Sequence, residues 1–319
     1  MKIIFLGTTA GVPTAERGHS AIAIKYQDET LLFDCGEGAQ RQLIKAKISF
    51  MKIAKILISH LHADHFLGLP GLIQSMSFLG REKTLTIYGP EGTESVVESL
   101  LKLGYYTLKF PVETKELRPG EIIECNNYKI FTQSTQHTVP TIAYAFQENQ
   151  RPGKFDVEKA LGLGIKPGPM FRKLQLGHSV QTKDGKTIKS EEVLGPPRRG
   201  RKIIYSSDTR PLLSIVDFAR EADVLIHEAT FADDLNERAS ETGHSTFGEA
   251  IEIAKQAQVK YLILTHISPR YENEDIEKFQ LDIRKKFENA IIARDMMVIE
   301  IPLYKEIKIN FFSNYLNKR

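Results

Sequence analysis

Short apolar runs alternate with helix-period stretches through the first 145 residues of this 319-residue chain, and the same alternation returns after residue 200. Strands are predicted at 2–7, 20–26, 29–36, 52–60 and 84–89, and helices at 39–46, 66–80 and 93–104, the last ending at Gly104. Strands that alternate with helices build sheets whose faces are covered by helices. The sequence therefore predicts one α/β domain over residues 1–319, with an inserted arm at 150–200.

The segment from Arg151 to Lys202 is strongly basic and rich in Gly and Pro. It holds thirteen Lys or Arg and five Asp or Glu, a net charge of +8, whereas the whole chain carries only +3. The rest of the chain is therefore acidic overall. This asymmetry indicates a local anionic partner, and a phosphate backbone is the obvious candidate. A solubilised surface insertion explains the charge equally well.

No apolar run approaches the roughly 18 residues needed to cross a bilayer, so neither a membrane segment nor a membrane partner is expected. The N-terminal "MKIIFLGTTAGVP" has the pattern of a strand and a turn rather than of a signal peptide. Cys35 and Cys125 do not make a disulfide framework and are expected to be reduced thiols. A cytoplasmic location is the resulting expectation.

Ionisable side chains end or follow several of the apolar runs. Five such positions are His60, His137, Asp208, His227 and His266. An α/β fold gathers its chemistry at one edge of its sheets in this way, because strand ends and the loops after them meet there. One such residue alone favours a structural role. Five of them, together with the cluster at 60–65, indicate a functional site.

The most specific pattern is "HLHADH" at residues 60–65. Residues i and i+2 of an extended segment point to the same side, so His60 and His62 can bind one ion together. Asp64 and His65 then lie where the next helix begins and can face a second site. Imidazole suits zinc, and a carboxylate can bridge two ions or hold a water. The pattern predicts a metal site, with a solvated loop as the alternative.

With H-x-H-x-D-H at 60–65, the chain resembles the metallo-β-lactamase superfamily, and more narrowly the ribonuclease Z family of tRNA 3′-processing endonucleases. The narrower resemblance rests on "FLGTTAGVPTAERGHS" at 5–20, "FDCGEGAQRQL" at 33–43, "HEAT" at 227–230, "GHST" at 243–246 and the basic insertion. Ala39 departs from the family pattern, which has Thr there. The C-terminal "YKEIKINFFSNYLNKR" is the part least covered. The resemblance implies an αββα sandwich.

The resemblance also implies two zinc ions per subunit. The first would be held by His60, His62 and His137, the second by Asp64, His65 and His266, and both by the bridging Asp208. Asp64 would accept the proton of the attacking water. Manganese or iron are alternatives to zinc, because metal availability helps to decide which ion fills a His/Asp site.

Two further residues are candidates for the leaving-group side of the reaction. His244 in "GHST" would protonate the 3′-oxygen, with Glu228 of "HEAT" orienting its other nitrogen. In the alternative reading, His244 contacts a phosphate without transferring a proton. Thr246 and Glu249 form T-x-x-E, which predicts a capping box at a helix start.

Two other residues near these motifs have open roles. Asp34 in "FDCGEG" would either orient a ligand histidine or form a plain turn. His227 is expected to support the site or pack in the core rather than to bind an ion.

RNA contacts are predicted in two segments. Thr14 and Arg17, with His19, lie in the loop after Val12-Pro13 and are candidates for substrate phosphates. The candidates in the arm are Lys166, Gly168, Pro169, Arg172 and Lys173. Precursor tRNA presents a paired backbone that is recognised by shape and phosphate contact. The resemblance implies that the arm at 150–200 is a tRNA exosite, and that in a homodimer it serves the partner's active site.

The resemblance thus implies a zinc-dependent endoribonuclease. It would cut the 3′ trailer from precursor tRNA after the discriminator base, leaving a 3′-hydroxyl on the tRNA and a 5′-phosphate on the trailer. One alternative is a small-molecule phosphodiesterase or another ester or lactone hydrolase of the superfamily, which has no need of a basic arm. The other is an RNA-binding protein with structural zinc, but such zinc is normally enclosed by four Cys/His ligands.

Overall fold

The computed structural model describes residues 1–105, 107–182, 184–303 and 305–311. The chain forms two compact units. The main unit comprises Met1–Ile123, Ile130–Phe146 and Ile203–Arg319, and the arm unit comprises Glu124–Lys129 and Gln147–Lys202. None of the described helices is long and apolar enough to cross a membrane.

The first large sheet has the strand order β17-β16-β1-β2-β3-β4-β5-β6. Its strands are β1 (Lys2–Gly7), β2 (Ala21–Tyr26), β3 (Glu29–Phe33), β4 (Ile53–Leu57), β5 (Leu85–Gly89), β6 (Val112–Glu116), β16 (Met297–Glu300) and β17 (Lys308–Phe311). Neighbours from β3 to β6 pair in parallel, and the other pairs are antiparallel. The predicted pair at 20–26 and 29–36 is the antiparallel hairpin β2–β3.

The second large sheet has the order β15-β14-β13-β12-β9-β8-β7. Its strands are β7 (Ile122–Glu124), β8 (Tyr128–Ser134), β9 (Ile142–Glu148), β12 (Lys202–Tyr205), β13 (Val224–Glu228), β14 (Tyr261–Thr265) and β15 (Ala290–Ile292). The strands from β12 to β15 are parallel. Their carboxyl ends therefore lie at one edge of the sheet.

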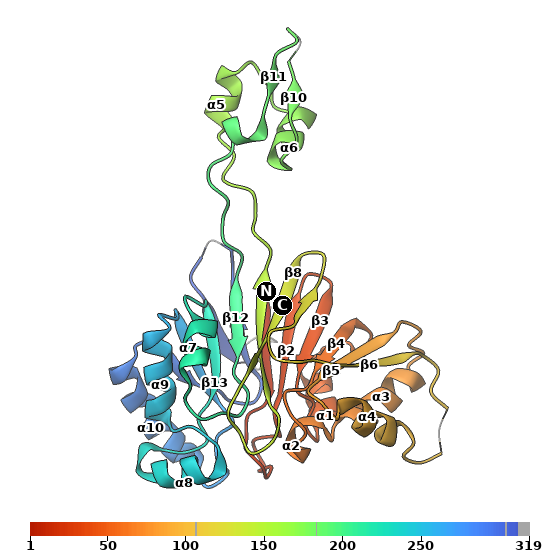
Figure 1. Ribbon diagram of the computed structural model, residues 1–319, viewed down its shortest axis with the longest axis vertical. Coiled ribbons are helices and arrows are strands. Elements are labelled where there is room, and N and C mark those ends of the chain that lie inside the picture. Colours follow the sequence, from red (N-terminus) through yellow and green to blue (C-terminus); the bar gives the residue numbers. More distant parts are fainter. Residues whose placement is uncertain (106, 183, 304, 312–319) are drawn as a thin grey trace. The chain divides into compact units, whose positions relative to one another are not determined.

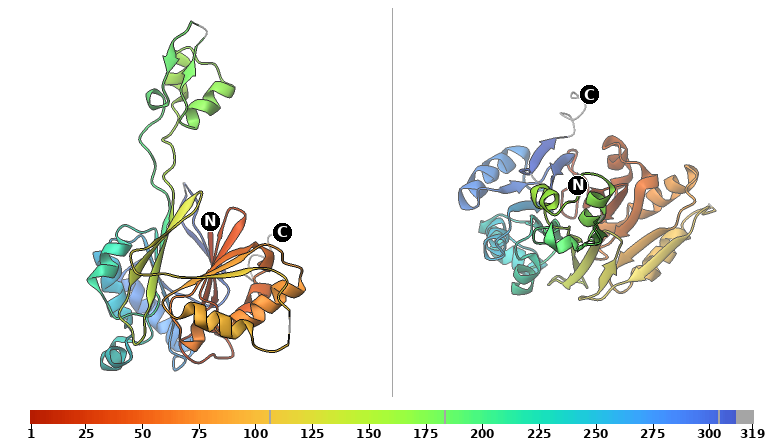
Figure 2. Two further views of the ribbon diagram at one scale, coloured as in Figure 1. Left: turned by 45° about the vertical axis from the view of Figure 1, so that its right-hand side comes forward. Right: turned by 90° about the horizontal axis from the view of Figure 1, so that it is seen from above.

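Helices cover the outer face of each sheet (Figures 1 and 2). On the first sheet these are α1 (Ala39–Lys45), α3 (Leu69–Phe78) and α4 (Thr93–Leu101), and on the second α7 (Leu213–Ala219), α9 (Phe247–Gln256) and α10 (Asn273–Lys286). Each set shares a buried apolar cluster with its own sheet. Helix α4 ends before Gly104, because the Lys102 N–H bonds to the Ser99 carbonyl and closes the last turn early.

Aromatic side chains join the inner faces of the two sheets. The Phe33 ring from β3 lies 5.9 Å from Tyr144 of β9 and 6.1 Å from Tyr205 of β12, measured between ring centroids. Tyr26 of β2 meets Phe146 in the same way, at 5.2 Å. Offset and edge-on aromatic pairs of this kind stabilise a sandwich core. With helices outside both sheets, this confirms the predicted αββα sandwich.

The arm unit has elements and a core of its own. It contains α5 (Val157–Gly162), α6 (Pro169–Gln175) and the short hairpin β10 (Val180–Gln181) with β11 (Thr187–Ile188). The Asp156 side chain accepts a hydrogen bond from the Lys159 N–H and caps α5. The buried apolar cluster of the arm unit comprises Ala160, Ile165, Leu174, Val180, Ile188 and Val193. Lys183, one of the basic residues counted above, lies outside the described residues.

Candidate metal centre

The predicted metal ligands lie at the ends of strands in both sheets. His60 comes three residues after β4, His137 three after β8, Asp208 three after β12, and His266 directly after β14. His62 immediately precedes the short helix α2 (Ala63–Phe66), whose first turn carries the remaining predicted ligands, Asp64 and His65. Because one edge of the sandwich carries these strand ends, ligands far apart in the sequence come together there.

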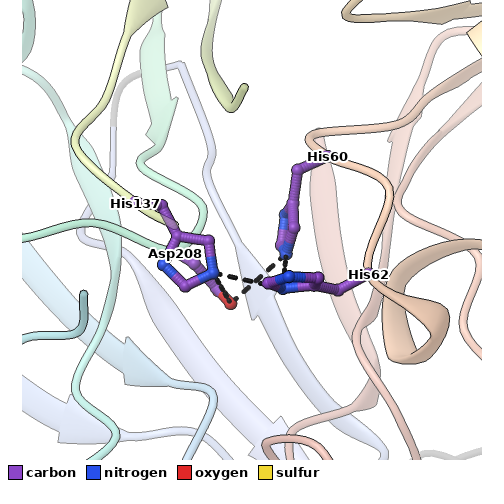
Figure 3. A group of neighbouring side chains, drawn as sticks. All are labelled: His60, His62, His137 and Asp208. Carbon is purple, nitrogen blue, oxygen red and sulfur yellow. Dashed lines mark hydrogen bonds and ion pairs between the residues drawn. The ribbon is translucent and has the colours of Figure 1, made fainter. Parts of the chain in front are cut away.

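Among the described residues, three groups of side chains have ligand atoms that lie within 4.8 Å of one another. Two of them contain the predicted ligands, and the third is Asp208, His244 and His266. The first group is His60, His62, His137 and Asp208, and the second is Asp64, His65 and His266. Figure 3 shows the first group, in which the three imidazoles and the carboxylate converge on one point. All seven predicted ligands belong to one of these groups.

The first group is closely spaced. The His62 Nδ1 atom lies 3.1 Å from His60 Nε2 and 3.2 Å from His137 Nε2. Asp208 Oδ2 lies 3.5 Å from His60 Nε2 and 3.9 Å from His137 Nε2. Three imidazole nitrogens and a carboxylate oxygen thus surround one small volume.

The second group adjoins the first through Asp208. His65 Nε2 lies 3.3 Å from His266 Nε2, and Asp64 Oδ2 lies 3.3 Å from His266 Nε2 and 3.5 Å from His65 Nε2. The same Asp208 Oδ2 atom lies 3.5 Å from His65 Nε2 and 3.4 Å from His266 Nε2. One carboxylate oxygen therefore lies between the two groups.

Hydrogen bonds at the far side of the rings orient the histidines. Nδ1 of His65 lies 2.7 Å from Asp34 Oδ2, and Nδ1 of His137 lies 2.9 Å from the Gly243 carbonyl. Nδ1 of His266 lies 3.0 Å from Thr230 Oγ1. A proton on Nδ1 that is donated outward leaves the Nε2 lone pair directed at the centre, which is the state a metal ligand needs.

Asp34 does more than form a turn. Besides His65, its carboxylate accepts hydrogen bonds from the Ser59 N–H (2.7 Å), the Ser59 hydroxyl (2.8 Å) and the Tyr205 hydroxyl (2.6 Å). Asp34 is wholly buried and has a φ of 56°, in the left-handed region that non-glycine residues rarely adopt. Ser207 and His266 have φ of 56° and 58°. The backbone is thus bent at three points that aim side chains at the cluster.

The chemistry of the donor set fits divalent cations. Among the described residues, Asp208 Oδ1 is buried and has no hydrogen-bond partner, a costly state for a carboxylate oxygen unless a cation satisfies it. Burial lowers the pKa of His60 well below its usual value and so keeps the imidazole neutral. Burial raises the pKa of Asp208, but the surrounding histidines outweigh burial and hold it well below its usual value. The clustered His and Asp residues are therefore able to bind metal.

A glycine allows the "FDCGEG" loop to pack against the "HLHADH" segment. A Cβ atom on Gly36 would lie 2.2 Å from the Asp64 carbonyl oxygen and 2.5 Å from His19 Cβ. Both distances are well below van der Waals contact, so a side chain at position 36 would clash with the backbone and only glycine fits here. The loop brings Asp34 to His65 by this close approach.

His244 lies beside both groups. Its ring centroid is 4.9 Å from that of His137 and 5.3 Å from that of His266. Its Nδ1 atom lies 2.9 Å from Glu228 Oε1. Burial lowers the pKa of His244, but the facing Glu228 carboxylate outweighs burial and raises it to about 9. The facing carboxylate therefore favours the protonated form of the ring.

Glu228 is itself held at several points. Oε1 also accepts hydrogen bonds from the N–H groups of Thr209 and Ser245, both at 3.1 Å. Oε2 accepts from the Thr230 hydroxyl at 2.8 Å, and that hydroxyl also bonds to His266. Glu228 thus connects His244 with the second group of ligands.

The predicted capping box is confirmed. Thr246 Oγ1 accepts from the Glu249 N–H, and the Glu249 side chain accepts from the Thr246 N–H. This box begins α9 at Phe247, three residues after His244. His227, by contrast, lies inside β13 and its Nδ1 lies 2.6 Å from the Glu228 carbonyl, which favours the packing role.

The N-terminal loop reaches the cluster through its backbone. The Gly11 N–H donates to Asp64 Oδ2 at 2.9 Å, and the Gly11 carbonyl lies 3.2 Å from Nε2 of the buried His19. Arg17 donates to the Tyr271 carbonyl (2.6 Å), and its N–H bonds to Thr14 Oγ1. This loop lines a cavity of about 430 Å³. A role for Thr14 and Arg17 in phosphate binding stays a prediction.

The five predicted RNA contacts of the arm lie around the start of α6. The group is Lys166, Gly168, Pro169, Arg172 and Lys173, and every member is exposed. Pro169 is the first residue of α6, and Gly168, with φ of 153°, precedes it. All five belong to the arm unit, whereas the metal-ligand candidates belong to the main unit.

Sequence patterns did not identify several residues that support the site. These are Ser59, Tyr205, Arg210 and Thr230. Thr230 stands in the quoted "HEAT" motif and Ser59 precedes His60, so both had a positional signal. Tyr205 and Arg210 had none, because their partners are remote in the sequence.

The chain is similar to ribonuclease Z proteins over nearly its whole length. It is 51% identical over 302 residues to the "Ribonuclease Z" of Methanosarcina mazei, covering 95% of this chain and 98% of that relative. The chain belongs to the ribonuclease Z family. A second member of the family, from Methanocaldococcus jannaschii, is 47% identical over 94% of this chain and 97% of its own length. This confirms the resemblance on which the sequence interpretation rested.

Two family models and several solved structures also match the chain. Residues 1–151 match a model described as "Anti-Pycsar protein Apyc1", and residues 173–267 match a "Beta-lactamase superfamily domain". The structure of the short form of human tRNase Z superposes with a TM-score of 0.70 and 29% identity, covering 95% of this chain and 100% of that one. YhfI from Bacillus subtilis, described as a metallo-beta-lactamase fold protein, gives a TM-score of 0.66 at 22% identity over 93% of this chain and 97% of its own, which shows the shared fold.

Proposed function

We propose that this chain is an endoribonuclease that removes the 3′ trailer from precursor tRNA. It would cut after the discriminator base, leaving a 3′-hydroxyl on the tRNA and a 5′-phosphate on the trailer. The observation that carries this proposal is the pairing of seven candidate His/Asp ligands with the partly exposed His244 and its buried partner Glu228, in a chain of the ribonuclease Z family. A cytoplasmic location follows from a tRNA substrate.

Two zinc ions per subunit are part of the proposal. The first would be bound by His60, His62 and His137, the second by Asp64, His65 and His266, and both by Asp208. Two ions in such a site supply Lewis-acid activation of a phosphodiester and of the attacking water, and clamp the attacking and leaving oxygens.

The side chains of this chain then move the protons. Asp64 is the proposed proton acceptor, because its Oδ2 atom lies within the second group of ligand candidates, 3.3 Å from His266 Nε2 and 3.5 Å from His65 Nε2. The Gly11 N–H fixes one of its oxygens. As the water oxygen bonds to phosphorus, its proton passes to Asp64, and the bond between phosphorus and the 3′-oxygen breaks.

His244 completes the step by giving a proton to the leaving 3′-oxygen. Its position next to both ligand groups and its bond to Glu228 support this role. The Glu228 carboxylate keeps the ring protonated before the step and orients it. If His244 only contacts a phosphate, its loss will weaken substrate binding rather than slow the departure of the 3′-oxygen.

The arm unit is proposed to bind the tRNA body. Lys166, Arg172 and Lys173 are exposed around α6. Exposed cations bind a phosphate backbone with little need for fixed geometry, since the attraction comes from charge and counterion release. Because the segment carries a net charge of +8, the whole arm unit supports this role.

A homodimer is proposed as well, in which the arm of one copy serves the site of the other. Large apolar side chains are exposed on α1 and just at the end of α3: Ile44 (62% exposed), Phe78 (80%) and Leu79 (62%). A hydrogen bond from Gln40 to Ser75 ties α1 to α3. Exposed apolar residues gathered on two tied helices favour a protein contact, and a second copy of the chain is the proposed occupant.

The proposed function is tested by cleavage of a synthetic precursor tRNA with a 3′ trailer. Metal-loaded protein and an Asp64→Asn variant are compared, with Asp217→Asn on the exposed face of α7 as the control. The expected result is a metal-dependent cut just after the discriminator base that Asp64→Asn abolishes and Asp217→Asn leaves intact. No cut by protein that carries two ions, together with hydrolysis of small phosphodiesters, would favour the small-molecule alternative.

A further inference from the structure

Arg210 lies at the junction of three loops that carry site residues. It follows Asp208 by two positions, after β12. Its backbone N–H donates to the Gln136 carbonyl at 2.8 Å, next to His137. Its side chain points to another loop, where Nη1 donates to the carbonyl of His244. One residue thus connects the loops of Asp208, His137 and His244.

The Arg210 guanidinium is also paired with Glu249. Nη2 lies 2.5 Å from Glu249 Oε1 and Nη1 lies 3.0 Å from Oε2, a two-pronged ion pair. The two side chains are only 15% and 19% exposed. Two parallel hydrogen bonds between a guanidinium and a carboxylate fix the relative orientation of the two groups as well as their distance. A Lys ammonium in the same place would not fix the orientation.

Glu249 in turn holds the residue after the "GHS" segment. Its Oε2 atom accepts from the Thr246 N–H at 2.9 Å in the capping box. The segment 244–246 is therefore held at both ends by one ion pair, at the His244 carbonyl by Arg210 and at the Thr246 N–H by Glu249. Between them, the Ser245 hydroxyl donates to the Thr209 carbonyl at 2.6 Å, one residue before Arg210.

We propose that the Arg210–Glu249 ion pair positions His244 for proton donation to the leaving oxygen. Arg210 is a positioning residue: in the structure its side chain touches the His244 backbone and Glu249, not the imidazole. Glu228 sets the direction of the His244 ring, and Arg210 sets the position of the backbone that carries it. This inference rests on the proposed function, in which His244 is the general acid.

The experiment uses two precursor tRNAs that differ in one atom. The first has the natural 3′-oxygen at the scissile bond, and the second has sulfur in its place. A thiolate leaves without protonation, so loss of a general acid slows cleavage of the oxygen substrate and spares the sulfur substrate. Cleavage rates under saturating substrate are measured for metal-loaded full-length protein and for His244→Ala, Arg210→Met, Arg210→Lys and the double variant His244→Ala/Arg210→Met.

Arg210→Met is expected to slow the oxygen substrate by about 10²-fold, because a small misplacement of a catalytic group has an effect of that size. The sulfur substrate should be cut at the wild-type rate. Adding Arg210→Met to His244→Ala should not lower the cleavage rate of the oxygen substrate further, because the two residues act as one unit. Arg210→Lys keeps the positive charge but loses the second hydrogen bond to Glu249. Its cleavage rate on the oxygen substrate should lie between those of Arg210→Met and wild type.

The control for loss of a buried guanidinium is Arg81→Met. Arg81 is 4% exposed and donates to the carbonyls of Phe50, Lys83 and Thr84, away from the site. Arg81→Met should lower the thermal unfolding temperature and leave the ratio of the cleavage rates of the oxygen and sulfur substrates unchanged. Metal content is measured for every variant.

Two results would overturn the inference in different ways. Equal slowing of both substrates by Arg210→Met, with selective slowing by His244→Ala, would show that Arg210 supports the Asp208 turn instead, and the proposed function would stand. Equal slowing of both substrates by His244→Ala would refute the general-acid role in the proposed function, and the role of Arg210 would fall with it.

Discussion

The candidate metal centre of the main unit and the exposed basic residues of the arm unit use their side chains in opposite ways. His60 and His65 are completely buried, and hydrogen bonds to Ser59 and Asp34 fix their rings. Lys166, Arg172 and Lys173 of the arm are exposed around a helix of seven residues. Chemistry at one phosphorus atom needs ligands fixed to fractions of an ångström, whereas charge attraction to a backbone does not. The first region therefore requires a large core around it, and the second does not.

The largest expected effect comes from the main unit. Asp64→Asn should lower kcat by about 10²–10⁴-fold, because an amide accepts no proton from the attacking water. The loss should be equal for precursor tRNA and for a small phosphodiester, since both react at the same cluster. Steady-state kinetics with both substrates measure it. If Asp64→Asn lost tRNA cleavage but kept hydrolysis of the small phosphodiester, the proposed separation of chemistry in the main unit from RNA binding in the arm unit would be contradicted.

The next prediction tests the hydrogen bond between Asp34 and the candidate ligand His65. Asp34→Asn weakens the carboxylate acceptor for His65 and should lower affinity for one of two bound ions by about 10–100-fold. Competition with a fluorescent chelator measures the affinity, and Asp156→Asn in the arm unit serves as the control. Unchanged affinity for both ions would mean that the Asp34–His65 bond does not stabilise a ligand.

Chelation gives a further test of the main unit alone. Removing metal should abolish hydrolysis of both substrates, and the melting transition of the main unit should fall because bound ions stabilise only the folded state. The affinity of the metal-free protein for tRNA should be largely retained. Filter binding and calorimetry measure the two quantities. Loss of tRNA binding on chelation would contradict independent roles for the two units.

A smaller effect is expected from the arm charges. Replacing Lys166, Arg172 and Lys173 by Ala should weaken tRNA binding and make its dependence on salt shallower by about 2 in log–log slope. Hydrolysis of a small phosphodiester should not change. Binding measured over a range of salt concentrations checks the slope. Weaker binding with an unaltered slope would argue against phosphate contacts by these residues.

The smallest effect compares one helix cap from each region. Thr246 caps α9 in the main unit and Asp156 caps α5 in the arm unit, each through a bond to the third residue of its helix. Either residue replaced by Ala should cost about 1 kcal/mol of stability. Hydrogen exchange should place the loss in α9 for one variant and in α5 for the other. Only Thr246→Ala should also slow cleavage, because its loop carries His244.

The sequence predicted which His and Asp residues cluster better than it predicted the contacts around them. His60 to His65 form a local pattern, and strand ends explain why Asp208 and His266 lie near them. The assignment of these residues as metal ligands came from the resemblance to the ribonuclease Z family. The bonds from Tyr205 to Asp34 and from Arg210 to Glu249 join residues 171 and 39 positions apart. Such pairs depend on the packing of two sheets and of loops, which no local pattern encodes.

The short helices of the arm unit were also not predicted from the sequence. The composition of the arm predicted an insertion with charge, but α5 and α6 have six and seven residues. Helices so short are marginal by themselves and form because Ala160 and Leu174 pack with Val180 and Ile188. Periodicity over one or two turns is too weak a signal to predict them. The alternation after residue 200, in contrast, repeats over several strands and could be read directly.

The most direct measurement removes α5, α6 and the β10–β11 hairpin of the arm unit and keeps the candidate metal centre. The Gly195 N–H bonds to the Lys154 carbonyl at 2.9 Å, so deleting residues 155–194 leaves ends that already lie together. The two kcat/KM values are then compared for precursor tRNA and for a small phosphodiester. A large fall for tRNA with no change for the small substrate is the predicted result. An equal fall for both substrates, in protein that keeps its metal, would contradict the account.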